Sequence, residues 1–167
     1  MNYKEIVAKA VVGKSKKTST NTYIMEVDNT PNTILGCWVI NNKFSGFTTG
    51  DDVLVTGTFD INVWYSYDND SKTAVGTKTF DYKDTLRVTP KENIIDGKEV
   101  EVRSLKQPSV SDVKIEDGKI KLTVEKELAV ELVGNTKIKV PVEALDDDYE
   151  DLSNMDNINE IKEDYIK

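Results

Sequence analysis

The feature that most constrains this chain is a strict two-residue alternation that runs from residue 53 to residue 67. One face of the pattern is apolar or aromatic apart from one glycine, and carries Val53, Val55, Gly57, Phe59, Ile61, Val63, Tyr65 and Tyr67. The opposite face carries Leu54, Thr56, Thr58, Asp60, Asn62, Trp64 and Ser66. Because successive side chains of a β-strand point to opposite faces, the pattern predicts a long strand with one face on a core. Gly57 favours a bend, and the unchanged phase on either side of it argues against a shift of register.

Trp64 is the exception on the more polar face of this strand, and it is one of only two tryptophans in the chain. Tryptophan is enriched at the centres of protein interfaces, where a partner buries the ring. We therefore interpret Trp64 as a contact residue, with Trp64, Tyr65 and Tyr67 as candidates for self-assembly or partner contact. Two coverings remain open for the Trp64 ring: another part of the same chain, or a neighbouring subunit.

Turn-forming stretches divide the rest of the chain into further short strands, so the predicted fold class is all-β, an antiparallel β-sandwich-like arrangement. These strands are expected over residues 17–26, 75–82, 84–89, 100–105, 119–132 and 137–142. The stretch ILGCWVI at 34–40 is apolar on both faces and predicts a central strand covered on both sides. The predicted core includes Trp38, Cys37, Phe59, Ile61 and Val63. Residues 3–11 have helical spacing, although a strand is nearly as well supported there.

A weak internal similarity suggests a division of the chain. Val53, Val55, Phe59, Ile61 and Val63 match Ile120, Leu122, Lys126, Leu128 and Val130 at a constant offset. One interpretation is two related β-modules, and the other is that amphipathic strands resemble one another by chance. On the first interpretation residues 1–103 form one module, residues 104–145 form a smaller module packed on it, and residues 146–167 form an acidic tail.

The tail carries most of the net charge of the chain. Residues 146–167 hold nine acidic side chains and two lysines, a charge of −7 out of −8 for the whole sequence. Apolar residues recur there at helical spacing, but the many Asp and Asn residues lower helix propensity. We expect the tail to act as a peptide that orders on a partner. Its candidate partner-binding residues are Asp146, Asp147, Asp148, Leu152, Met155, Ile158 and Tyr165.

Several classes of chemistry are excluded by what the sequence lacks. There is no histidine and only one cysteine, so Ser-His-Asp and Cys-His catalysis and histidine-based metal sites are absent. No phosphate-binding glycine motif is present, and we predict no catalytic residues, no cofactor and no metal site. An acidic chain disfavours nucleic-acid binding. No apolar run approaches the roughly 18–20 residues that span a bilayer, and no signal-peptide core occurs, so we expect no membrane insertion.

Five stretches, in this order, resemble the outer spore coat morphogenetic protein E (CotE) family of endospore-forming bacteria. They are KAVVGKSKKT at 9–18, ILGCWVIN at 34–41, DINVWYSYDNDSKT at 60–73, LKQP at 105–108 and VGNTK at 133–137. The resemblance covers residues 3–145, and DINVWYSY is its most specific motif. Members of this family tend to end in a long acidic tail rich in Glu and Trp, whereas the acidic run here is short and has no Trp.

The resemblance implies a non-enzymatic role in building the spore coat. Such proteins are made in the mother-cell cytoplasm during sporulation and then lie in the spore coat. They self-associate into a layer, dock on a basement-layer protein and recruit outer coat proteins. The alternative hypothesis is a β-sandwich module that binds carbohydrate or another ligand through Trp64, Tyr65 and Tyr67. A carboxylate-dependent hydrolase is a third and weaker alternative.

Overall fold

The computed structural model describes residues 2–142, and every regular element within them is a β-strand. The six strands are β1 (Asn2–Met25), β2 (Pro31–Thr49), β3 (Asp52–Tyr67), β4 (Lys72–Arg87), β5 (Asp96–Glu116) and β6 (Lys119–Val142). The predicted all-β class is confirmed. Residues 3–11, for which helix and strand were both open, belong to β1.

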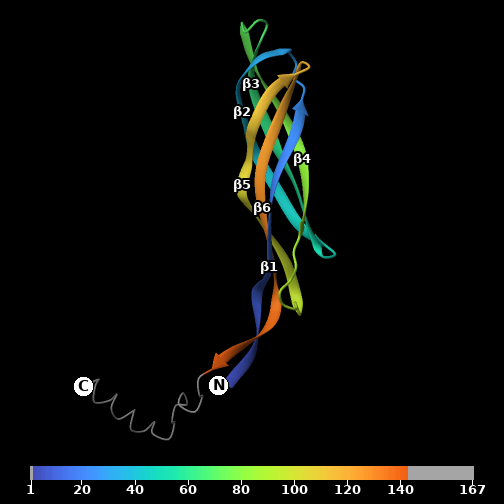
Figure 1. Ribbon diagram of the computed structural model, residues 1–167, viewed down its shortest axis with the longest axis vertical. Helices are drawn as coiled ribbons and strands as arrows, with labels where there is room; N and C mark the ends of the chain where they lie inside the picture. The colour runs from blue at the N-terminus through green and yellow to red at the C-terminus, as the bar shows by residue number, and fades with distance from the viewer. Residues whose placement is uncertain (1, 143–167) are drawn as a thin grey trace, which may run out of the picture. The chain divides into compact units, whose positions relative to one another are not determined.

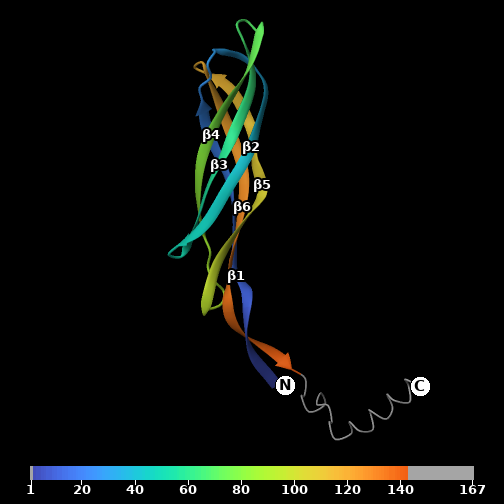
Figure 2. The same cartoon turned by 180° about the vertical axis from the view of Figure 1, so that it is seen from behind.

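The strands form two antiparallel sheets of three, ordered β1-β6-β5 and β2-β3-β4. Within residues 8–136 the two sheets pack as layers (Figure 1), and the reverse view brings the β2-β3-β4 sheet to the front (Figure 2). The central strands, β3 and β6, supply most of the core. Their buried apolar side chains are Val53, Val55, Phe59, Ile61, Val63 and Tyr65 from β3, and Ile120, Leu122, Val124, Leu128, Val130 and Leu132 from β6.

The alternation that dominates the sequence is the inward and outward phase of β3. Its register with β4 is unbroken from Asp52 opposite Arg87 to Tyr67 opposite Lys72, so no shift occurs at Gly57. The glycine has a packing reason, because a Cβ built there would lie 2.3 Å from Cζ of Tyr82. Any larger residue would therefore collide with the ring that crosses β3 at this point.

Contacts along the chain divide it into two compact units. The larger unit, Ala8–Thr136, contains the core described above. The smaller unit combines Met1–Val7 with Lys137–Lys167, and the structure describes residues 2–7 and 137–142 of it. These two described segments are the first residues of β1 and the last residues of β6.

The prediction that residues 34–40 form a central strand, covered on both sides, is wrong. They belong to β2, which is an edge strand of its sheet, not a central one. Trp38, predicted to be in the core, has 43% of its surface exposed. The stretch is apolar on both faces for two different reasons, since one face packs on the core and the other carries large apolar groups to the surface.

Several predicted strand boundaries are also corrected. Residues 75–82 and 84–89 were expected as separate strands, but β4 continues without a break from Lys72 and ends at Arg87. Residues 119–132 and 137–142 were likewise expected as separate strands, but β6 runs through both from Lys119 to Val142. Gly134 there is a packing residue, because a Cβ on it would lie 2.6 Å from Cγ2 of Ile94.

The internal similarity falls on structurally equivalent strands. Its two halves lie in β3 and β6, the central strands of the two sheets. Both strands need apolar residues at alternate positions because both face the core. The division into modules at 1–103 and 104–145 stays a prediction, and residues 103 and 104 both lie within β5. The tail at 146–167 lies outside the described residues.

Candidate contact face

Large apolar side chains gather on the outer face of the β2-β3-β4 sheet. Trp38 and Ile40 come from β2, Trp64 from β3 and Val75 from β4. Both tryptophans are more than two-fifths exposed, at 43% for Trp38 and 42% for Trp64, and Val75 is 57% exposed. We refer to these four residues as the tryptophan patch.

Strand register explains why the patch is continuous. Trp64 lies opposite Gly36 on β2 and opposite Val75 on β4, while Trp38 lies opposite Asn62, one step along the same face. Diagonal neighbours on one face of a sheet are within reach of aromatic side chains. A Cβ on Gly36 would lie 3.2 Å from Cζ3 of Trp38 and 3.8 Å from Cε3 of Trp64. Both indole rings therefore lie close to Gly36, and a side chain at this position would contact both of them.

Polar side chains beside the patch are tied to one another along the sheet. Asn41 Nδ2 donates to Asp60 Oδ2 at 2.8 Å, and the Thr79 hydroxyl donates to Asp60 Oδ1. These hydrogen bonds, that of Asn41 first, hold the pKa of Asp60 below its usual value. The Thr77 hydroxyl donates to Asn62 Oδ1 at 2.8 Å. The apolar groups are thus bordered by an ordered row of amide, hydroxyl and carboxylate groups.

The structure separates the three aromatic residues predicted as contact candidates. Trp64 is exposed, whereas Tyr65 is only 2% exposed and points into the core. Tyr67 is partly buried, and its ring lies 6.1 Å from the Tyr65 ring. The three cannot form one platform, because adjacent residues of a strand face opposite sides. The tail candidates, Asp146, Asp147, Asp148, Leu152, Met155, Ile158 and Tyr165, lie outside the described residues.

The remaining predicted core residues lie on the inward side. Phe59, Ile61 and Val63 are buried, and Cys37 is half-buried against the core. Burial raises the pKa of the Cys37 thiol to about 11. Trp38 is the exposed aromatic residue that sequence reasoning missed. The available signal was phase, since Gly36, Trp38 and Ile40 alternate with Cys37 and Val39.

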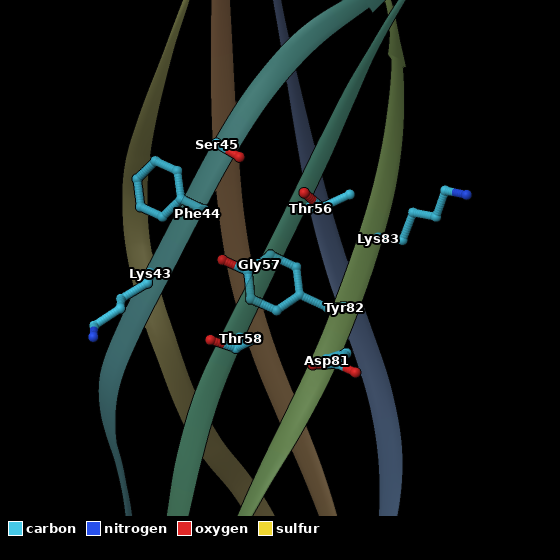
Figure 3. A pocket seen from close by; sticks show the side chains of 9 residues that line it. All are labelled: Lys43, Phe44, Ser45, Thr56, Gly57, Thr58, Asp81, Tyr82 and Lys83. Carbon is cyan, nitrogen blue, oxygen red and sulfur yellow. The ribbon is translucent and has the colours of Figure 1, made fainter.

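A shallow hollow of about 590 Å³ lies further along the same sheet. Its floor is at Gly57, where the Tyr82 ring reaches across from β4, as Figure 3 shows. The rim carries Lys43, Ser45, Thr56, Thr58, Asp81 and Lys83. These side chains include no nucleophile paired with a base. Among residues 2–142 no cluster of three acidic or sulfur-bearing side chains is placed to hold a metal ion.

One further cluster was not predicted, and it lies in the core. Asp84 of β4 and Lys126 of β6 are both buried, and Lys126 Nζ lies 3.1 Å from Asp84 Oδ2. The sequence held a signal for it, because Lys126 occupies an inward position in the row from Ile120 to Val130. Alternation likewise places Asp84 between Tyr82 and Leu86, which are both buried.

Comparison with known families gives one match. Residues 2–167 match the family model described as Outer spore coat protein E (CotE). No curated protein and no solved structure matches the chain. Residues 2–142 contain no helix that is long and apolar enough to cross a membrane. The match spans nearly the whole chain and agrees with the resemblance of its five sequence stretches, so the chain belongs to the outer spore coat protein E (CotE) family.

Proposed function

We propose that this chain is a non-enzymatic structural protein of the outer spore coat that self-associates into a layer and recruits outer coat proteins. Family membership supports the location in the spore coat. The tryptophan patch supports self-association, and it is the observation that carries the proposal.

The patch has the composition of an interface core. Charged side chains are depleted at the centres of interfaces, whereas aromatic residues are enriched there. Trp38, Ile40, Trp64 and Val75 carry no charge and lie on one sheet face. Exposed apolar groups gathered in this way mark interaction surfaces, whereas isolated ones need no explanation. A second copy of the chain would remove both indole rings from water.

The sheet edges are less suitable for assembly than this face. The edge strands β2 and β5 both have register shifts in their pairing, β2 with β3 and β5 with β6. The β4 edge carries four exposed cations, Lys72, Lys78, Lys83 and Arg87. Bulges and basic side chains both discourage pairing between edge strands. The edges of β2, β4 and β5 are therefore poorly suited to pairing with another chain, which favours association through a sheet face.

The direct test is to replace both indole rings, with Trp38→Ser and Trp64→Ser in the full chain. We expect size-exclusion chromatography with light scattering to show smaller species than the unaltered protein forms. The free energy of unfolding of the dissociated protein should change by about 1 kcal/mol or less, because the rings are exposed before association.

Leu105→Ser is the matched control, since Leu105 is a large apolar residue that is 54% exposed on β5. It should leave the oligomer unchanged. The proposal fails if the double tryptophan variant keeps the oligomer size of the unaltered protein. It also fails if the unaltered protein is monomeric at all concentrations.

Recruitment is assigned to the acidic tail, as the sequence suggests. Its acidic residues and its apolar Leu152, Met155, Ile158 and Tyr165 would bind a basement-layer protein or an outer coat protein. Removal of residues 146–167 should leave the β-domain folded and self-associating while partner capture is lost. A melting temperature lowered by many degrees would instead make the tail part of the domain.

Carbohydrate binding is the second candidate, and one observation favours it. Indole rings beside hydrogen-bonding amide and hydroxyl groups suit a sugar, and the patch is bordered by Asn62 and Thr77. Retention of the monomer on insoluble polysaccharide, lost in the double tryptophan variant, would support this candidate. The self-association test separates the two, since a carbohydrate module need not oligomerise.

A further inference from the structure

Two reactive side chains meet inside the core. Asp84 extends from β4 in one sheet and Lys126 from β6 in the other. Their side chains are 7% and 3% exposed, and Lys126 Nζ lies 3.1 Å from Asp84 Oδ2. Each interrupts a row of buried apolar residues, so the amine and the carboxyl group face each other in a buried site.

As an ion pair this arrangement is poorly satisfied. Burying two charges costs desolvation energy that is recovered only with good geometry and further hydrogen bonds. Asp84 Oδ2 is buried, and within residues 2–142 it accepts no hydrogen bond of normal geometry. Besides Asp84, the Lys126 amine has among residues 2–142 a long contact of 3.5 Å to Asn21 Oδ1, and it lies 4.6 Å from the centre of the Tyr82 ring.

The other carboxylate oxygen is differently placed. Asp84 Oδ1 accepts a hydrogen bond of 3.2 Å from the Ser19 hydroxyl, and Lys17 Nζ lies 3.5 Å from it. Both donors come from β1. One oxygen of the carboxyl group is therefore held by a hydroxyl and a cation, while the other faces the amine.

From this geometry we propose that Lys126 and Asp84 condense to form an intramolecular amide bond that joins the two sheets. A proton passes from the Lys126 ammonium to Asp84 Oδ2, which leaves a neutral amine beside a neutral acid. The Nζ lone pair then forms a bond to Cγ. The Cγ–Oδ2 bond breaks, and Oδ2 takes a second proton from the nitrogen and leaves as one water molecule. No oxidant, reductant or further reactant is consumed.

Ser19 and Lys17 are positioning residues for this step. As Nζ attacks Cγ, negative charge develops on Oδ1, which these two groups already contact. Donors fixed in advance at a developing oxyanion stabilise the transition state without reorganisation. Oδ2 has no such partner, and this difference makes it the leaving oxygen.

Proximity lowers the barrier that free amines and acids face in water. Groups held in reacting geometry reach effective concentrations of about 10⁵–10⁸ M. The Tyr82 ring packs against the Lys126 amine, and the burial of both reacting side chains opposes the reverse hydrolysis. The product is a covalent tie between β4 and β6, which holds the tryptophan-bearing sheet to the other one.

The test is the mass of the intact, denatured full-length chain. The amide predicts a mass lower by one water molecule than the sequence requires. Proteolysis should then release a branched peptide that contains both Asp84 and Lys126. A full sequence mass with separate peptides would overturn the proposal and leave a buried ion pair only.

Variants assign the bond to these residues. Lys126→Arg keeps a cation but removes the nucleophilic amine, so this protein should have its full sequence mass. Lys121→Arg is the control, because Lys121 lies on the same strand and faces outward, and it should still lose one water. Loss of water in Lys126→Arg would contradict the assignment. Ser19→Ala should slow the loss after refolding by about 100-fold or more, as for removal of an oxyanion donor.

Discussion

The outer faces of the two sheets carry different kinds of side chain. On the β1-β6-β5 sheet, acidic and basic side chains meet in pairs, such as Lys106 with Glu125 at 2.9 Å and Lys121 with Glu116 at 3.5 Å. On the β2-β3-β4 sheet, the tryptophan patch and its border are rich in tryptophans, threonines and asparagines, and the charged side chains lie mainly further along the sheet. Both sheets complete the same core from their inner faces. Under the proposed function, the first face is suited to water and the tryptophan patch to a covering partner.

The largest expected change in the free energy of unfolding comes from the core that the two sheets share. Phe59→Ala should destabilise the domain by about 3–5 kcal/mol, because it removes a fully buried ring from the core between the two sheets. Equilibrium denaturation measures this loss. Thr58→Ala, the outward neighbour on β3, is the control and should cost about 0.5 kcal/mol or less. Equal losses for the two variants would contradict the inward and outward phases of this strand.

A charge should distinguish the two outer faces. Trp64→Lys places a cation in the tryptophan patch and should weaken self-association about 100-fold, as expected for a central aromatic contact. Thr123→Lys adds the same cation to the outer face of β6 and should leave association unchanged. Sedimentation at a series of concentrations gives both constants. Similar losses in the two variants would remove the distinction between the faces.

Cysteine reactivity tests the boundary between face and core on β2. Cys37 points inward beside the exposed Trp38, and its pKa is raised by burial to about 11. Since the thiolate is the reactive form, alkylation of the native protein at pH 8 should be about 100-fold slower than that of the unfolded chain. The native rate should rise with pH until about pH 11. Equal native and unfolded rates would place Cys37 on the exposed face.

The smallest expected effect is the coupling free energy of an exposed ion pair on the β1-β6-β5 sheet. A double-mutant cycle on Lys106 and Glu125 should give a coupling free energy of about 0.2–1 kcal/mol, because both side chains are exposed. That coupling should fall at high salt, whereas self-association through the tryptophan patch should not weaken. An oligomer that dissociates as salt is raised would indicate that charged groups hold it together.

The phase of β3 and the outward direction of Trp64 could be predicted from the sequence because alternation depends only on neighbours along the chain. Trp38 could not be placed in this way. An apolar run does not reveal whether its strand is central or at an edge, since edge position depends on pairing between distant segments. The predicted break between residues 132 and 137 was wrong for a related reason: Gly134 makes room for Ile94 and does not form a turn.

For the buried pair of Asp84 and Lys126, the inward position of Lys126 could be predicted from the sequence. Lys126 was already matched to Phe59 in the internal similarity, which assigns it to the inward phase. A lysine facing the core requires an acceptor, but the identity of that acceptor depends on which strand of the opposite sheet lies above it. Only the three-dimensional arrangement supplies Asp84 as that acceptor.

Oxidative footprinting of the monomer and the assembled protein tests the central claim most directly. Hydroxyl radicals should oxidise Trp38 and Trp64 in the dilute monomer, and assembly should protect both rings. Leu105, exposed on β5, should be modified equally in the two states. Equal oxidation of the tryptophans before and after assembly, with protection found instead on the charged face, would contradict the assignment of the β2-β3-β4 sheet as the contact face.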